Sequence, residues 1–362
     1  MRMQVTVILA LLPSVFINIM PAQTLSQTTM NKIDSMFSNY QSPAPGASII
    51  IIKDGEILYQ KGYGFADIDN DKPTAPNTNY RLASVTKQFT AMGIMILAEQ
   101  GKISLDDPLI KYFPNYPKWA EQIKIINMLN HTSGIWDYEA LIPDDWAIPV
   151  SDADVFNAIM EEDSLYFNPG EKFQYSNTAY VLLGLIIEKL SGLSFSEFLK
   201  EYIFIPLEMN NSSTNLMNAK IPNRAFGYSE VKGSFVKTDQ SITSYTLGDG
   251  GIYSSVSDLF KWEKSLYTEK FVSKSSLEKI FSVSSIISEE NNEAYGLGWY
   301  ISSRYGKKCI WHSGNSRGFT NLITRFPDEK LSIIILTNRN EADLDSIEKQ
   351  LEELVFHNNS VQ

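Results

Sequence analysis

The sequence predicts a mixed α/β (α+β) fold, in which an antiparallel sheet built from both ends of the chain is interrupted by a mainly helical region. Strand-like runs bounded by turn residues occur near the start and again near the end. Between them, apolar residues recur with the helical period. We therefore assign the sheet to residues of about 30–82 and 285–362, and the helical region to about 83–284.

The N-terminus has the features of an export signal. A positive charge precedes a mostly apolar stretch over residues 5–20, and the small residue Ala22 follows at a suitable cleavage point. A proline and an asparagine inside the stretch make it a weak membrane span, so an uncleaved anchor is the less favoured alternative. We expect residues 1–22 to be a signal peptide. Residues 23–362 would then be the mature domain, secreted or periplasmic, with no stable membrane span.

The first part of the sheet is predicted from alternating apolar residues and turn signals. In order, we expect a helix around residues 33–37, a strand over 47–52, a turn at 53–55, a returning strand over 56–63 and a short extended piece at 80–82. A strongly apolar helix follows over residues 85–100. Gly101 ends it, because glycine readily adopts the left-handed conformation of a helix cap.

The last part of the chain returns to the strand period after a middle region of helical patterns, such as residues 181–190, and polar loops. We expect strands at residues 296–302, 308–312, 319–326 and 331–336, followed by an amphipathic helix over 341–356. Short turns between these strands indicate an antiparallel meander. The apolar face of the closing helix is suited to covering that sheet.

Composition excludes several classes of function. Acidic residues outnumber basic ones, 42 to 31, and no Lys/Arg-rich run is present, so nucleic acid is not an expected partner. The single cysteine, Cys309, cannot form an internal disulfide. The three histidines, His131, His312 and His357, do not have the close spacing of a zinc site. We therefore expect neither a metal site nor a cofactor.

A Ser-x-x-Lys pattern, with Ser84 and Lys87, provides a candidate nucleophile and base. A serine hydroxyl needs a base beside it, and residues three apart share one face of a helix. Ser84 opens the buried apolar helix, which places its hydroxyl at the positive end of the helix dipole and would desolvate Lys87. The same pattern at Ser276 and Ser346 lies in polar or amphipathic helices, where helix capping and solvation are the ordinary explanation.

Two further stretches carry candidate functional groups. Tyr175 precedes an apolar helix, and a tyrosine near a lysine ammonium can lose its proton more readily, so it is the candidate proton shuttle. Tyr166 also begins a Tyr-x-Asn pattern, for which packing against a Pro-Gly turn is the stronger reading. In the second stretch, His312 lies at a strand end. The backbone amide of Asn315, just past Gly314, could donate to an oxyanion together with that of Ser84.

The order of these motifs is similar to that of the serine beta-lactamase (class C) and DD-peptidase-like superfamily, the penicillin-recognising serine hydrolases of peptidase family S12 type. The resemblance rests on Ser84-Val85-Thr86-Lys87, Tyr175-Ser176-Asn177 and His312-Ser313-Gly314, supported by the stretches 131–135, 250–254 and 295–299. It implies a beta-lactamase/transpeptidase-like fold, with an antiparallel sheet flanked by terminal helices plus a mainly helical domain.

The same resemblance implies roles for these residues. Ser84 would attack an acyl carbon, Lys87 and Tyr175 would move its proton, and the amides of Ser84 and Asn315 would hold the oxyanion. Asn177 would bind the substrate's amide and Lys87. His312, Ser313 and Gly314 would border the substrate.

One departure concerns substrate choice, because the beta-lactamases of the superfamily carry Lys-Thr-Gly where this chain has His312-Ser313-Gly314. A histidine is mostly uncharged at neutral pH, which weakens attraction for a substrate carboxylate. We therefore expect a hydrolase of an amide or ester in a small molecule or peptide, of DD-carboxypeptidase, D-aminopeptidase or esterase type. An acyltransferase, a true beta-lactamase and a non-catalytic peptide-binding relative are the alternatives.

Several points stay open at the level of sequence. Ser316 lies in a Gly-x-Ser-x-Gly pattern, but the nucleophile elbow of α/β-hydrolases needs a helix after it and a strand is expected there. Aromatic residues that could line the site mouth, or only pack, are Trp136, Tyr138, Trp146 and Tyr245. Arg317 and Arg339 could bind a carboxylate or only face solvent. The acyl donor, the acceptor and the oligomeric state are not predicted.

Overall fold

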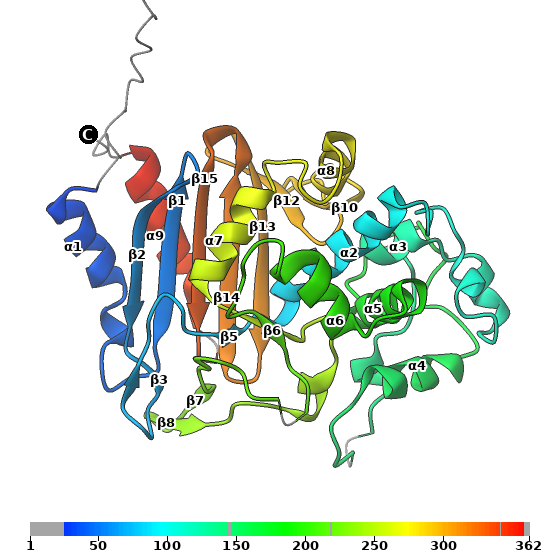
Figure 1. Ribbon diagram of the computed structural model, residues 1–362, viewed down its shortest axis with the longest axis horizontal. Coiled ribbons are helices and arrows are strands. Elements are labelled where there is room, and N and C mark those ends of the chain that lie inside the picture. Colours follow the sequence, from blue (N-terminus) through cyan, green and yellow to red (C-terminus); the bar gives the residue numbers. More distant parts are fainter. Residues whose placement is uncertain (1–24, 144–145, 218, 341, 358–362) are drawn as a thin grey trace, which may run out of the picture.

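The computed structural model describes residues 25–143, 146–217, 219–340 and 342–357. The expected signal peptide, residues 1–22, lies outside the described residues. Within them, the predicted architecture of an antiparallel sheet with a helical part beside it is confirmed (Figure 1).

The main sheet has eight strands in the order β10-β11-β12-β13-β14-β15-β1-β2, with every neighbouring pair antiparallel. Its strands are β1 (Ala47–Lys53), β2 (Glu56–Tyr63), β10 (Ser285–Ser288), β11 (Glu293–Tyr295), β12 (Tyr300–Arg304), β13 (Lys307–Ser316), β14 (Phe319–Phe326) and β15 (Leu331–Thr337). The N-terminal hairpin joins the C-terminal meander where β1 pairs with β15, with Ile50 opposite Ile334. The two ends of the chain therefore form one sheet.

Both faces of the sheet are covered by helices. Successive side chains of a strand point to opposite faces, so neighbouring residues of β1 pack in different clusters. In β1, Ile49 and Ile51 pack in one apolar cluster with residues of α1 (Gln27–Met36) and α9 (Leu344–His357). Ile50 packs in a second cluster with residues of α2 (Lys87–Glu99) and α7 (Val256–Ser265). Figure 1 shows α1 and α9 together on one side of the sheet and α7 in front of it. This continuous burial explains the unbroken apolar run of β1.

The helical part lies beside the sheet, with α2 between the two (Figure 1). Its other helices are α3 (Ile125–Leu129), α4 (Asp152–Met160), α5 (Asn177–Ser191), α6 (Phe195–Leu199) and α8 (Lys274–Ile280). Among the described residues, three small sheets complete the fold: β3 (Phe65–Asp67) with β4 (Lys72–Pro73), β5 (Tyr80–Arg81) with β9 (Ile252–Ser254) and β6 (Ser213–Thr214), and β7 (Tyr228–Val231) with β8 (Ser234–Lys237). The buried helix α5 packs against α2, so the core of this part lies directly behind the start of α2.

One predicted strand is wrong. Residues 296–302 were expected to be a single strand, but β11 ends at Tyr295 and β12 begins at Tyr300. The amide of Gly296 donates to the Trp299 carbonyl at 2.8 Å and closes a turn. Gly298 in that turn has φ of +80°, which is outside the strand region.

No single helix among the described residues is long and apolar enough to cross a membrane. The bent pair formed by residues 177–191 and 195–204 meets the criteria of length and composition only when the two helices are taken together.

Candidate active site

Ser84 lies where β5 gives way to a helix. A 3₁₀ turn, η2 (Ala83–Thr86), follows the strand and continues directly into α2. Ala83 holds φ of +49°, an uncommon conformation for a non-glycine residue. Between residues 80 and 97, Ser84 alone keeps part of its surface exposed. Its hydroxyl is therefore accessible to a substrate.

Lys87 is fully buried behind Ser84 and uses its ammonium group in three hydrogen bonds. Nζ donates to Ser84 Oγ at 3.1 Å, to Asn177 Oδ1 at 2.8 Å and to the Asp249 carbonyl at 2.9 Å. Burial lowers the pKa of Lys87 to about 8, although nearby carboxylates, Asp249 first, act in the opposite direction. A lysine with such a pKa can accept a proton from the serine near neutral pH.

Tyr175 lies over the same ammonium group. Lys87 Nζ is 4.8 Å from the centre of its ring. Burial raises the pKa of Tyr175, and the hydrogen bond with the Ser84 side chain offsets this only in part. The expectation that the lysine makes this tyrosine lose its proton more readily is therefore wrong for the free protein. Tyr175 is a neutral phenol in contact with Ser84, able to pass a proton along without being ionised beforehand.

Asn177 is held at the start of α5. Ser176 caps the helix, since its Oγ accepts from the amide of Ala179 at 3.1 Å. The Asn177 amide donates to Asp137 Oδ2 at 2.6 Å, and a carboxylate at a helix N-terminus is favourably placed. Since Asn177 Oδ1 accepts from Lys87, Asp137 fixes the residue that orients the lysine.

His131 supports Tyr175 from behind. It is fully buried, its ring lies 4.2 Å from that of Tyr175, and its Nδ1 accepts from the Ser176 amide at 3.1 Å. Burial lowers its pKa well below the ordinary value, so the ring is neutral. His131 therefore positions Tyr175 and Ser176. In the sequence it supported the family resemblance but suggested no such role.

His312 is buried in β13 rather than exposed to a substrate. Its Nδ1 lies 2.6 Å from the Ser313 carbonyl and must carry the hydrogen, so Nε2 accepts from the Tyr295 hydroxyl at 3.0 Å. Burial, with the charge of Lys87 as a smaller cause, lowers the pKa of His312 to about 3. The third motif therefore contributes no positive charge at neutral pH, as the sequence suggested.

Gly314 allows β13 to pass close to the nucleophile. A Cβ atom at this position would collide with the carbonyl oxygen of Leu82 and would lie 3.2 Å from a methyl group of Val85. No larger residue fits without moving the backbone. The close approach brings the end of β13 beside Ser84. Ser313, the residue before Gly314, is half-buried there.

A polar pocket of about 260 Å³ opens at this junction. The residues that line it include Arg81, Ser84, Asn177, Asp249, Asn315 and Arg317. Asn315 is exposed in it, within the same cavity as Ser84. The structure thus brings Ser84, Lys87, Tyr175 and Asn177 into one cluster, with Asn315 across the pocket.

The competing Ser-x-x-Lys and Gly-x-Ser-x-Gly patterns have no such surroundings. Ser276 Oγ donates to Glu99 at 2.6 Å on an exposed part of the surface. Ser316 ends β13 and is followed by β14, so a β-hairpin replaces the strand-to-helix turn that a nucleophile elbow requires. The alternative nucleophile at Ser316 is therefore contradicted.

The other open residues separate into pocket and packing positions. Tyr138 and Arg317 line the pocket. Trp136 instead packs on Tyr166, with ring centres 4.0 Å apart, so the Tyr-x-Asn pattern at Tyr166 belongs to a loop contact. Arg339 donates to Glu230 at 2.9 Å and is not one of the pocket residues.

Comparison with known proteins gives consistent matches over most of the chain. The sequence profile of the Beta-lactamase family matches residues 33–355. Penicillin-binding protein 4* of Bacillus subtilis (strain 168) is 34% identical over 311 residues, which cover 81% of this chain and 68% of that protein. Protein flp of Staphylococcus aureus (strain MW2) is 32% identical over 333 residues, which cover 87% of this chain but only 64% of flp. The chain thus spans about two thirds of the length of these relatives.

Solved structures show the same architecture. The octameric penicillin-binding protein homologue from Pyrococcus abyssi has a TM-score of 0.80 and 32% identity, covering 92% of this chain and 78% of that one. The D-amino acid amidase from Ochrobactrum anthropi SV3, solved with L-phenylalanine amide, has a TM-score of 0.77 at 24% identity, covering 91% and 97% of the two chains. At that identity, the likeness to the amidase concerns the fold alone.

Proposed function

Because this chain belongs to the Beta-lactamase family of serine hydrolases, we propose that it cleaves amides or esters through an acyl-enzyme formed on Ser84. The observation that carries the proposal is the Lys87 ammonium group, which is buried, bonded to Ser84 Oγ and lowered in pKa to about 8. A buried lysine with such a pKa beside a reachable serine is the arrangement that an activated nucleophile needs.

The proposed acylation uses the contacts around Ser84. Neutral Lys87 takes the hydroxyl proton while Ser84 Oγ attacks the substrate carbonyl carbon. The amides of Ser84 and Asn315 are proposed to donate to the oxyanion. As the bond to the leaving group breaks, the Tyr175 hydroxyl gives its proton to that group and regains one from Lys87. Water then attacks the ester carbonyl of the acyl-enzyme, and the reverse proton transfers release the acid and restore Ser84.

Amides and esters of D-amino acids and peptides are the proposed substrates, ahead of beta-lactams. A lysine at the third motif would attract the carboxylate of a beta-lactam, whereas His312 is uncharged because burial lowers its pKa to about 3. A D-amino acid amidase with the same fold, at 24% identity, supports the choice of D-amino acid amides as the first substrates to test. Hydrolysis of D-phenylalanine amide and its L-isomer provides the first comparison.

The test compares ester hydrolysis by the wild type, Ser84→Ala and Ser276→Ala. The last variant is a matched control, since Ser276 begins the same sequence pattern but bonds to Glu99 at the surface. With 4-nitrophenyl acetate, we expect Ser84→Ala to lose at least about a thousandfold in kcat/KM, as removal of a nucleophile does, and Ser276→Ala to match the wild type. Equal activity of Ser84→Ala and wild type would refute the proposal.

A further inference from the structure

We propose that Arg81 is the centre of a carboxylate-binding subsite in the pocket that holds Ser84. The inference rests on the proposed hydrolase function and adds one property of its substrates, a free carboxylate group. It starts from the position of Arg81, which lies on β5 three residues before Ser84 and lines the same pocket of about 260 Å³.

Two of the three guanidinium nitrogens of Arg81 are buried without a partner. Arg81 is only 3% exposed, and its Nε and Nη1 atoms are buried with no hydrogen-bond acceptor among the described residues. It also forms no ion pair with any carboxylate in that part of the chain. An arginine stays charged at any physiological pH, and an unpaired buried charge is strongly unfavourable. A binding site for an anion is the arrangement that explains such a group.

The other described arginines with buried or half-buried side chains each contact a carboxylate. Arg325, with a side chain 1% exposed, bonds to the equally buried Glu263 at 2.7 Å. Arg304 and Arg224 each contact a carboxylate, at 2.8 Å and 2.6 Å. Burial of an arginine in this protein is thus normally accompanied by an acidic partner from the chain itself. Arg81 is the exception among the described residues, and it is the one that lines the pocket beside Ser84.

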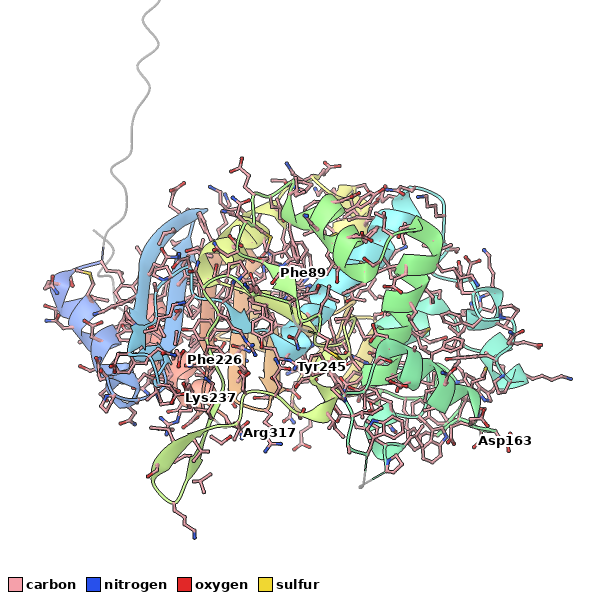
Figure 2. All side chains as sticks on the ribbon, turned by 60° about the horizontal axis from the view of Figure 1, so that its bottom comes forward. Phe89, Asp163, Phe226, Lys237, Tyr245 and Arg317 are labelled. Atoms are coloured by element: carbon pink, nitrogen blue, oxygen red, sulfur yellow. The ribbon has the colours of Figure 1, made fainter. Side chains whose placement is uncertain are left out.

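The surroundings of Arg81 supply further groups for an anion. Ser316 and Arg317 line the same pocket, and the Ser316 hydroxyl is buried without a partner. Figure 2 shows Arg317 on the side of the molecule turned toward the viewer, below Tyr245. Asp249 and Glu139 also line the pocket, but neither is among the ion-pair partners of an arginine in the described part of the chain. A hydroxyl donor and an exposed cation therefore accompany the buried guanidinium.

This subsite supplies a cationic group that the third motif lacks. His312 is uncharged because burial lowers its pKa to about 3. Arg81 and Arg317 each bring a guanidinium group, whose planar set of N–H donors matches the two oxygens of a carboxylate. Hydrogen bonds from a guanidinium to a carboxylate are among the stronger ones in proteins. The occupant is a carboxylate of the substrate, carried either by its leaving group or by its acyl group.

The test uses two matched pairs of esters that place the carboxylate on different sides of the reacting bond. In the first pair, phenylacetylglycine is esterified with 3-hydroxybenzoate or with uncharged 3-hydroxybenzamide. In the second pair, 4-nitrophenyl hemisuccinate is compared with 4-nitrophenyl butyrate. For each pair, the measured quantity is the ratio of kcat/KM for the charged ester to that for the neutral one. The pair with the higher ratio identifies which side of the substrate binds at Arg81.

Three variants separate the subsite from general damage. Arg81→Gln removes the buried charge, Arg317→Gln removes the exposed charge, and Arg339→Gln removes a charge outside the pocket. We expect Arg81→Gln to lower the ratio by about tenfold to a hundredfold, as loss of hydrogen bonds to a charged group does. We expect at most about threefold for Arg317→Gln, since exposed charges contribute little, and no change for Arg339→Gln. A loosened fold would lower both rates of a pair and leave the ratio unchanged.

Two results would overturn the inference: wild-type ratios near one for both pairs, or a ratio that Arg81→Gln leaves unchanged. Neither result bears on the proposed hydrolase function. That proposal is refuted only if hydrolysis of the neutral esters does not depend on Ser84. If Arg81→Gln does not fold, the melting temperature of the wild type serves instead. N-acetyl-D-alanine is expected to raise it more than N-acetyl-D-alaninamide does, and equal shifts would overturn the subsite.

Discussion

The pH dependence of the reaction follows from the burial of Lys87. Burial lowers its pKa from an ordinary 10.5 to about 8. At pH 7 a lysine of pKa 8 is neutral in about one molecule of eleven, whereas an exposed lysine of pKa 10.5 is neutral in about one of three thousand. The pocket therefore increases the fraction of active base about 300-fold, which corresponds to 2.5 pKa units.

The sign of the effect is fixed by the role of the base. Only neutral Lys87 accepts the Ser84 proton, so kcat/KM rises tenfold per pH unit below pH 8 and levels off above it. Activity at pH 7 is about one tenth of the plateau, and at pH 6 about one hundredth. The buried His312 adds no step between pH 5 and 8, because its pKa is held at about 3.

The assay is kcat/KM for an uncharged ester from about pH 5.5 to 9.5 at constant ionic strength, with Ser84→Ala subtracted as the blank. Lys87→Met should remove the rise near pH 8 together with most of the activity. A flat profile over this range, or a midpoint near 6.5 as an exposed histidine would give, would refute the assignment of Lys87 as the base.

Three substitutions test the supports of the site. Gly314→Ala places a Cβ against the Leu82 carbonyl and is expected to cost about 1–3 kcal/mol in unfolding free energy and at least tenfold in kcat/KM; unchanged values would contradict the close approach. Asp137→Asn removes a negative charge that raises the pKa of Lys87, so the midpoint of the pH profile should move to lower pH, and no shift or the opposite shift would contradict it. Ala83→Gly removes the Cβ atom from a residue in the left-handed region and should raise the free energy of unfolding, measured by urea titration, by up to about 1 kcal/mol. The control Ala91→Gly, inside α2, should lower it by about 1 kcal/mol. Equal decreases in the two variants would show that the backbone at Ala83 is not strained.

Much of the sheet could be predicted because its signals are local. The observed β14 has the predicted bounds, and β1 and β2 follow the predicted hairpin around Asp54. Alternation and turn residues act over a few positions, so they are legible in one sequence. By contrast, β5, β6 and β9 have two or three residues each, too few to show a period, and β6 and β9 were not predicted.

The site residues likewise divide into those that a local pattern predicts and those that only the fold brings together. Ser84 and Lys87 could be predicted because residues three apart share one face of a helix, and Lys87 Nζ lies 3.1 Å from Ser84 Oγ in the structure. Asp249 was missed, since it bonds to Lys87 through its backbone carbonyl, which any residue type has. Asp137 lies 40 positions from its partner Asn177, beyond any local pattern. Arg81 Nε and Nη1 are unpaired because no hydrogen-bond acceptor lies near them among the described residues, and only the folded structure shows which groups surround them.

The most direct test of the central claim is to identify the residue that carries the acyl group. Wild type and Ser84→Ala would be mixed with a slowly hydrolysed activated ester, quenched in acid, digested and examined by mass spectrometry. The acyl-enzyme mechanism predicts a single added acyl group on the peptide containing Ser84, absent from the variant. An acyl group at Ser316, or the same adduct in Ser84→Ala, would contradict it.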